Sequence, residues 1–265
     1  MNRTLLILLL ATASLAQTAP PPQTSAAQAA PVQDENTRKA RAWIDKMIAA
    51  LGGNAYLNIQ DMTQEGRTYG FSHGESAGGA PFWRFYKWPD KERLELTKQR
   101  DWIIIHNGDK GWEQTFRGTA LEDPEALQTF LDRSQYALDR IVRIWLHEPG
   151  VLIFDDGAAI AERKQAEKIT LMNTNNEAVS IFIDSLNFLP IKRTYQHRNK
   201  TYKDLDTEDE TYDNWHEVQG IKTPYDITRV HNGEPQNQRF INKVTYNSGL
   251  AESLFEPKGP VKDAR

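Results

Sequence analysis

The chain has 265 residues, with 32 Lys and Arg against 36 Asp and Glu, and a formal net charge of −4. This balance, without any local stripe of basic residues, excludes a general nucleic-acid-binding protein. The absence of cysteine excludes disulfide bonds, thiol catalysis, zinc–thiolate and iron–sulfur sites, and a lipidated N-terminal cysteine.

The N-terminus has the pattern of an export signal. Met1–Arg3 is a short basic segment and Thr4–Ala16 is apolar. The apolar run is shorter than the roughly 20 residues that a membrane-spanning helix needs, and the small residues before Gln17 suit cleavage by a signal peptidase. We therefore predict that residues 1–16 are a cleaved signal peptide and that the product is periplasmic and not an integral membrane protein. A retained membrane anchor is the alternative.

The next segment differs in composition. Residues 17–36 are rich in Pro, Ala and Gln and have few large apolar side chains, which predicts a disordered linker. A folded domain is expected over residues 37–257, and residues 258–265 are expected to form a flexible tail. The domain begins with a predicted helix, which Asp34 or Asn36 can cap and which ends at Gly52-Gly53. Its apolar face contains Ala40, Ile44, Met47, Ile48 and Leu51.

Beyond this helix the apolar pattern alternates, as in β-strands. Short turns such as Asn107–Gly111 and His231–Glu234 separate the runs, so consecutive strands are expected to pair as an antiparallel meander. The predicted strands include Phe82–Lys87, Leu94–Leu96, Trp102–Ile105, Trp112–Phe116, Ile169–Met172, Val179–Ile183, Leu189–His197, Glu208–Val218, Tyr225–His231 and Phe240–Tyr246.

One helical stretch, Pro124–Glu148, interrupts the strands. Asp123 is the predicted N-cap, and the polar Arg133–Gln135 leaves open whether the stretch is one helix or two. The order of elements predicts an α+β, mainly antiparallel β fold, in which a large sheet carries helices on one face.

No catalytic motif, metal-ligand spacing or cofactor fingerprint is present, so neither an enzyme nor a cofactor or metal is predicted. His147-Glu148 is followed by Pro149-Gly150, which ends the helix before a second histidine ligand. The acidic run Asp204–Glu210 lacks the glycine and glutamate of a calcium loop and is interpreted as a solvated hairpin or sheet edge. Asp155–Gly157 is interpreted as a turn.

Aromatic residues are concentrated between the first strands and the helical stretch. They either fill the core or line a pocket for an acyl chain, and periodicity alone leaves both open. As a hypothesis, the lipid-binding residues are Trp83, Phe85, Trp102, Ile104, Trp112, Phe116, Ile141, Val142 and Trp145. Whether Trp102 and Ile104 share a face with Trp112 and Phe116 depends on the register of the turn between them.

Several of these segments resemble the periplasmic outer-membrane lipoprotein carrier (LolA-like) superfamily. The resemblance rests on Trp83–Arg93, on Ile103–Trp112, on Leu189–Lys192 and on Phe255-x-Pro257. The opening Ala49–Gly53, with Gly66-Arg67, is similar to its secreted, outer-membrane lipoprotein-sorting-like branch.

This resemblance implies an incomplete β-barrel whose helices cover a hydrophobic cavity on its concave face. Well-known carriers hold a basic residue just before the strand proline, where it helps to govern the lid; here that position is Trp88. The implied function is binding of a lipid or lipoprotein acyl chain, in lipoprotein sorting or lipid transport for outer-membrane biogenesis, with an envelope protein as a further partner. An envelope scaffold with a closed core and an unrecognised hydrolase are the alternatives.

Overall fold

The structure, a computed structural model, describes residues 35–199 and 201–262. The predicted signal peptide and most of the predicted linker lie outside these residues. The described strands are β1 (Asp61–Ser72), β2 (Glu75–Lys87), β3 (Lys91–Leu96), β4 (Trp102–Asn107), β5 (Lys110–Thr115), β6 (Gly118–Leu121), β7 (Leu152–Ala161), β8 (Lys164–Met172), β9 (Ala178–Asp184), β10 (Pro190–Arg198), β11 (Leu205–Val218), β12 (Ile221–His231), β13 (Glu234–Tyr246) and β14 (Val261–Lys262).

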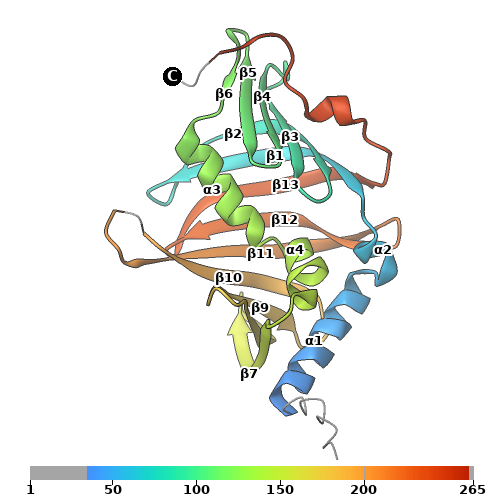
Figure 1. The fold of residues 1–265 in the computed structure, drawn as a ribbon. Coiled ribbons are helices and arrows are strands. Elements are labelled where there is room, and N and C mark those ends of the chain that lie inside the picture. The colour runs from blue at the N-terminus through green and yellow to red at the C-terminus, as the bar shows by residue number, and fades with distance from the viewer. Residues whose placement is uncertain (1–34, 200, 263–265) are drawn as a thin grey trace, which may run out of the picture. The chain divides into compact units, whose positions relative to one another are not determined.

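All fourteen strands belong to one sheet, in the order β14-β6-β5-β4-β3-β2-β1-β13-β12-β11-β10-β9-β8-β7. Two meanders, β1 to β6 and β7 to β13, meet where β1 pairs with β13, and the predicted antiparallel pairing is confirmed for every pair except the parallel β14 and β6. The sheet curves without closing, with β14 and β7 at its edges (Figure 1). The predicted incomplete barrel of α+β class is confirmed.

Helices cover the concave face of this sheet (Figure 1). They are α1 (Glu35–Leu51), α2 (Asn54–Leu57), α3 (Pro124–Gln135), α4 (Leu138–Arg143) and the 3-10 helix η1 (Trp145–His147), while a second 3-10 helix, η2, spans Glu252–Phe255. None of the helices in this described part is both long and apolar enough to cross a bilayer.

The end of α1 is fixed by Gly52, as the sequence predicts. Gly52 has a φ of +125°, and a Cβ built there would lie 2.5 Å from the carbonyl oxygen of Gly220. Only glycine fits this conformation and this close approach. At the other end, Asn36 lies inside the helix and does not precede it. Its side chain exchanges two hydrogen bonds with the backbone of Asp155, at 2.7 and 2.8 Å, which attaches α1 to β7.

The helical stretch is divided in two, which settles the question left open by its sequence. Asp123 caps α3 as predicted, because its Oδ1 accepts hydrogen bonds from the N–H groups of Glu125 and Ala126, both at 3.0 Å. The break falls at Tyr136-Ala137, just after the polar segment. Tyr136 is buried there and stacks on Tyr195 of β10, with the ring centroids 3.9 Å apart.

The turn predicted at residues 155–157 differs from the structure. Asp155–Gly157 is not a turn: it lies within β7, at a bulge opposite β8, where Gly157 adopts a φ of +86° and the Asp156 carboxylate pairs with Lys168. Within the segment expected to form a flexible tail, Val261–Lys262 forms β14 beside β6, and the carbonyl oxygen of Lys258 accepts a hydrogen bond from Thr119 at 2.7 Å; the flexibility of this segment stays a prediction. Both contacts join residues distant in sequence, so local turn signals could not predict them.

Candidate functional site

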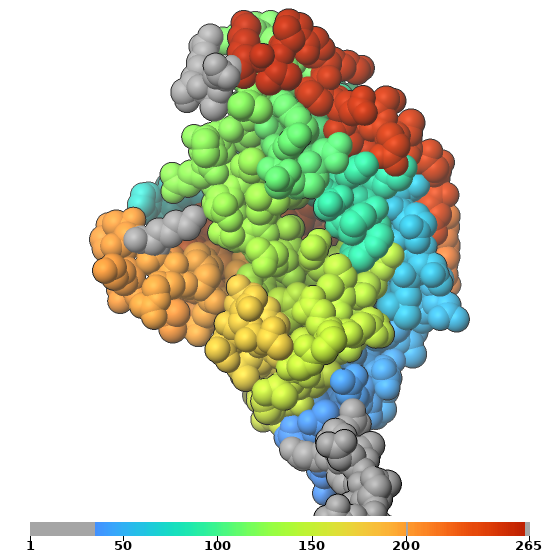
Figure 2. Space-filling view, viewed as in Figure 1, coloured from blue at the N-terminus to red at the C-terminus, as the bar shows by residue number. Residues whose placement is uncertain are grey.

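A cavity of about 770 Å³ lies between the concave face of the sheet and the helices. Figure 2 shows a hollow on this side of the molecule, beside the green atoms of the helical segment, with deeper red atoms of the sheet visible at its floor. The volume falls within the roughly 300–1,000 Å³ that is usual for small-molecule pockets.

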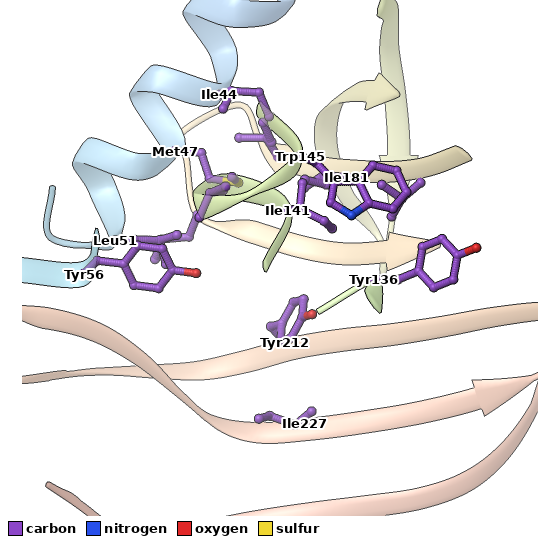
Figure 3. Packing of buried hydrophobic residues seen from close by; sticks show 14 of the residues in the cluster. Ile44, Met47, Leu51, Tyr56, Tyr136, Ile141, Trp145, Ile181, Tyr212 and Ile227 are labelled. Atoms are coloured by element: carbon purple, nitrogen blue, oxygen red, sulfur yellow. The ribbon is translucent and has the colours of Figure 1, made fainter. Parts of the chain in front are cut away.

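One end of the cavity is apolar and aromatic. The strands contribute Tyr212 and Trp215 from β11, Ile227 from β12 and Tyr246 from β13. Figure 3 shows Tyr212 and Ile227 on the strands opposite Leu51 and Tyr56 of the first two helices and Trp145 of η1. Leu51, Tyr56 and Trp145 also line the cavity, so this end is bounded by apolar surface from both layers.

The other end contains buried ion pairs. Arg84 Nε of β2 lies 2.5 Å from Glu92 Oε2 of β3. Glu210 of β11 is shared: its Oε2 lies 3.0 Å from Arg229 Nε of β12, and its Oε1 lies 3.5 Å from an Arg193 nitrogen of β10. Glu210 Oε1 also accepts a hydrogen bond from the Tyr212 hydroxyl at 2.9 Å.

The two glutamates are held ionised by these arginines. Burial by itself would raise the pKa of Glu92, but the charges of Arg84 and His106 outweigh it and lower the pKa to about 2. The pKa of Glu210 is lowered well below its usual value in the same way, because the charges of Arg193, Arg229 and Arg239 outweigh its desolvation. A carboxylate that is charged throughout the neutral range is suited to fixing cations and not to transferring protons.

We expect the free energy of unfolding to fall as the pH is lowered from about 5 to about 2. A carboxyl with a depressed pKa binds fewer protons in the folded state than in the unfolded one, so its stabilisation is complete above the unfolded pKa and is lost on acidification. Denaturant midpoints measured across this range check it. Glu92→Gln should be less stable at pH 7 and show a shallower decline; an unchanged slope would contradict the assignment.

The nine residues of the lipid-binding hypothesis do not come together: those on strands lie on both faces of the sheet, and Ile141, Val142 and Trp145 lie on α4 and η1. In the ladder of β4 and β5, Ile104 is opposite Glu113 and Ile105 is opposite Trp112, so Trp112 lies on the face opposite to Ile104 and Trp102. Trp102 is 43% exposed and Phe116 is 83% exposed. The two aromatic sets therefore do not form one floor.

The remaining predicted residues lie apart from one another. Trp83 and Phe85 face the outer side of the sheet, beneath Arg100, which also pairs with the buried Glu95. Ile141 and Val142, both on α4, are fully buried in the core. Of the nine, Trp145 lines the cavity, and its role in lipid binding stays a prediction.

The acidic run is neither a hairpin tip nor an edge. Residues 205–210 belong to β11, which lies between β10 and β12 in the sheet. Basic side chains on both of these neighbouring strands pair with the carboxylates of β11. Glu208 lies 2.6 Å from His231 Nδ1, and Asp209 lies 3.6 Å from Lys192. Glu210, which faces the cavity, was missed as a site residue. The alternation of Glu208, Glu210 and Tyr212 along one predicted strand is the signal that could have placed them on one face.

Contacts between strand and helix hold α4 over the cavity. The Tyr86 hydroxyl donates a hydrogen bond to Asp139 Oδ2 at 2.9 Å. The Arg143 guanidinium lies 3.6 Å from the centre of the Trp88 ring and donates a hydrogen bond to the carbonyl of Ile59 at 2.8 Å. Trp88 stands where the family resemblance leads us to expect a basic residue; here it is the aromatic partner of a cation that comes from α4.

Comparison with known proteins identifies the fold. No family model matches the sequence, and no curated protein matches it by sequence. Among solved structures, a DUF1329 family protein from Desulfovibrio piger matches with a TM-score of 0.58 at 11% identity, over 82% of this chain and 97% of that one.

Two further structures match over a similar length. One is a putative outer membrane lipoprotein-sorting protein domain from Vibrio parahaemolyticus, with a TM-score of 0.54 at 10% identity, covering 83% of this chain and 97% of that one. The other is a LolA superfamily protein from Nitrosomonas europaea, with a TM-score of 0.51 at 13% identity, covering 82% of this chain and 97% of that one. The resemblance to the LolA-like superfamily is thereby confirmed at the level of the fold.

Proposed function

We propose that this protein is a periplasmic carrier that binds the acyl chain of a lipid or lipoprotein in its cavity. The observation that carries the proposal is the cavity of about 770 Å³ with an apolar, aromatic end beneath the helices. Burying an acyl chain there contributes about 0.8 kcal/mol per methylene, so eight methylenes give about 6 kcal/mol before the cost of association.

The cavity favours this function over the two alternatives. A scaffold with a closed core would fill the space with its own side chains, and here the space between sheet and helices is open. A hydrolase would need an acid–base pair whose pKa values lie near the working pH, whereas the two carboxylates at the charged end of the cavity that pair with its arginines, Glu92 and Glu210, are both held ionised. Lipoprotein sorting or lipid transport, with an envelope protein as partner, is the role in the cell that we propose.

Filling the cavity should remove chain binding without removing the fold. Ala137 lies at the start of α4 and lines the cavity, so Ala137→Trp is expected to weaken binding of a fluorescent fatty acid by at least about tenfold, because it excludes the volume of several methylenes. Ala126→Trp, on the exposed side of α3, is the matched control and should bind as wild type does.

Native mass spectrometry of the protein released from its own envelope by osmotic shock tests the same proposal directly. A bound lipid mass that is absent from Ala137→Trp supports it. A protein that carries no lipid and that binds neither fatty acid nor lipopeptide in its folded state is not a carrier. N-terminal sequencing of the same material checks the expected start near Gln17.

A further inference from the structure

The charged end of the cavity contains more positive than negative charge. We define the arginine cluster as Arg84, Arg133, Arg193, Arg229 and Arg239, all of which line the cavity. Within the described residues, Glu92 and Glu210 are the two carboxylates that form ion pairs with these five arginines. Two carboxylates cannot balance five guanidinium groups, so these pairs leave an excess of three positive charges at the wall of the cavity.

Arg239 is one of these groups. Its nearest carboxylate oxygen is Glu210 Oε2, at 3.9 Å, and that oxygen already accepts a hydrogen bond from Arg229 at 3.0 Å. The Nε of Arg239 is buried and has no hydrogen-bond partner among the described residues. Burial, together with the charges of Arg229 and Arg84, lowers the pKa of Arg239 to about 9. A buried donor that is left without an acceptor is costly.

Arg133, from α3 on the opposite wall, is the second. In the part of the chain that the structure describes, its side chain has neither an ion pair nor a hydrogen bond, and the centre of the Phe130 ring lies 5.9 Å from its guanidinium carbon. The nearby charge of Arg229, together with burial, lowers the pKa of Arg133 to about 10. Cations from the helix and from the sheet thus repel each other across the same space.

The charged and the apolar side chains of the cavity are separated along the direction of the strands. On β11, the cavity residues run from Glu210 through Tyr212 to Trp215; on β12, Arg229 is followed towards the same end by Ile227. The arginines are therefore at one end and the aromatic and aliphatic side chains at the other. A ligand that matches both ends has an anionic group on an apolar chain.

We propose that the arginine cluster is an oxyanion subsite, which binds the carboxylate or phosphate head of an amphiphile whose chain lies in the apolar end. Guanidinium groups present N–H donors in a planar fork that matches these oxyanions. The oxyanion would supply the missing acceptor for Arg239 and the missing counter-charge for Arg133. This inference rests on the proposed function and adds the chemical class of the ligand.

Three probes with the same chain and different heads test it: hexadecanoic acid, hexadecyl phosphate and hexadecanol, each measured by displacement of a fluorescent fatty acid. The wild-type protein should bind both anions at least about tenfold more tightly than the alcohol, because charge-assisted hydrogen bonds to a buried head are lost with the alcohol. The anion that binds more tightly, hexadecanoic acid or hexadecyl phosphate, shows whether the natural ligand has a carboxylate or a phosphate head. Inorganic phosphate should weaken binding of the two anions and leave the alcohol unaffected.

Arg133→Gln and Arg239→Gln should each reduce the preference for the anions to below about threefold and leave the affinity for the alcohol unchanged. Arg67→Gln, an exposed arginine of β1 outside the cavity, should retain the wild-type preference. Each variant is first checked for an unchanged denaturation midpoint. Because Arg133 lies on the surface of a helix, Arg133→Gln alone provides the test if Arg239→Gln fails to fold. Equal and tight binding of all three probes by wild type would overturn the oxyanion subsite and leave the carrier function standing. Binding of none of them would overturn both.

Discussion

Glu210→Gln is expected to lower the free energy of unfolding by about 3–5 kcal/mol, the usual cost of removing one partner from a buried ion pair. Glu210 is the anion shared by Arg193, Arg229 and Arg239, and Arg193 is 3% exposed. Without the carboxylate, three arginines from three strands would face one another with no counter-charge. Chemical denaturation at pH 7 measures the loss.

Glu217→Gln is the matched control for this prediction. Glu217 lies on the same strand, its side chain is 63% exposed, and it pairs with Lys222 at 3.1 Å. An exposed pair contributes about 0–1 kcal/mol, so this variant should be nearly as stable as wild type. A loss at position 210 no larger than that at position 217 would contradict the view that the carboxylate holds the cluster together.

Trp145→Ala is the second large effect that we expect, at about 3–5 kcal/mol of unfolding free energy. Trp145 is 4% exposed, its ring lies 5.6 Å from that of Tyr136, and it lines the apolar end of the cavity. Its removal should also weaken binding of a fluorescent fatty acid, because part of the apolar wall is lost. Denaturation and binding are measured on the same preparations.

Two variants make this result interpretable. Trp145→Phe keeps an aromatic ring and should preserve enough stability for binding to be compared in the folded state. Phe116→Ala removes a residue of the same lipid-binding hypothesis that is 83% exposed, and its effect on stability should stay within about 0.5 kcal/mol, with binding unchanged. If folded Trp145 variants bind the fatty acid as wild type does, this wall does not contact the chain.

The sequence alone determined the elements whose causes are local. Apolar spacing predicted α1, and Gly52 predicted its end, because a positive φ depends on the residue itself. The Asp123 cap and the polar interruption before Ala137 likewise predicted where the helical stretch begins and where it weakens. Short turns predicted consecutive antiparallel strands, whereas the incomplete barrel was an expectation from the family resemblance. The fold class followed from these local signals.

Only the tertiary structure decided which side chains meet. A shift of one residue in the ladder of β4 and β5 exchanges the faces of Ile104 and Trp112, and no property of the turn sequence fixed that register. Glu210 lies in an acidic run, and its sequence neighbours alone indicate a side chain exposed to solvent. It becomes the centre of a buried cluster because Arg193, Arg229 and Arg239 approach it from three other strands. Periodicity reports only the face of one strand, whereas a binding site requires the faces and registers of several strands at once, and those are fixed by pairing between residues far apart in the chain.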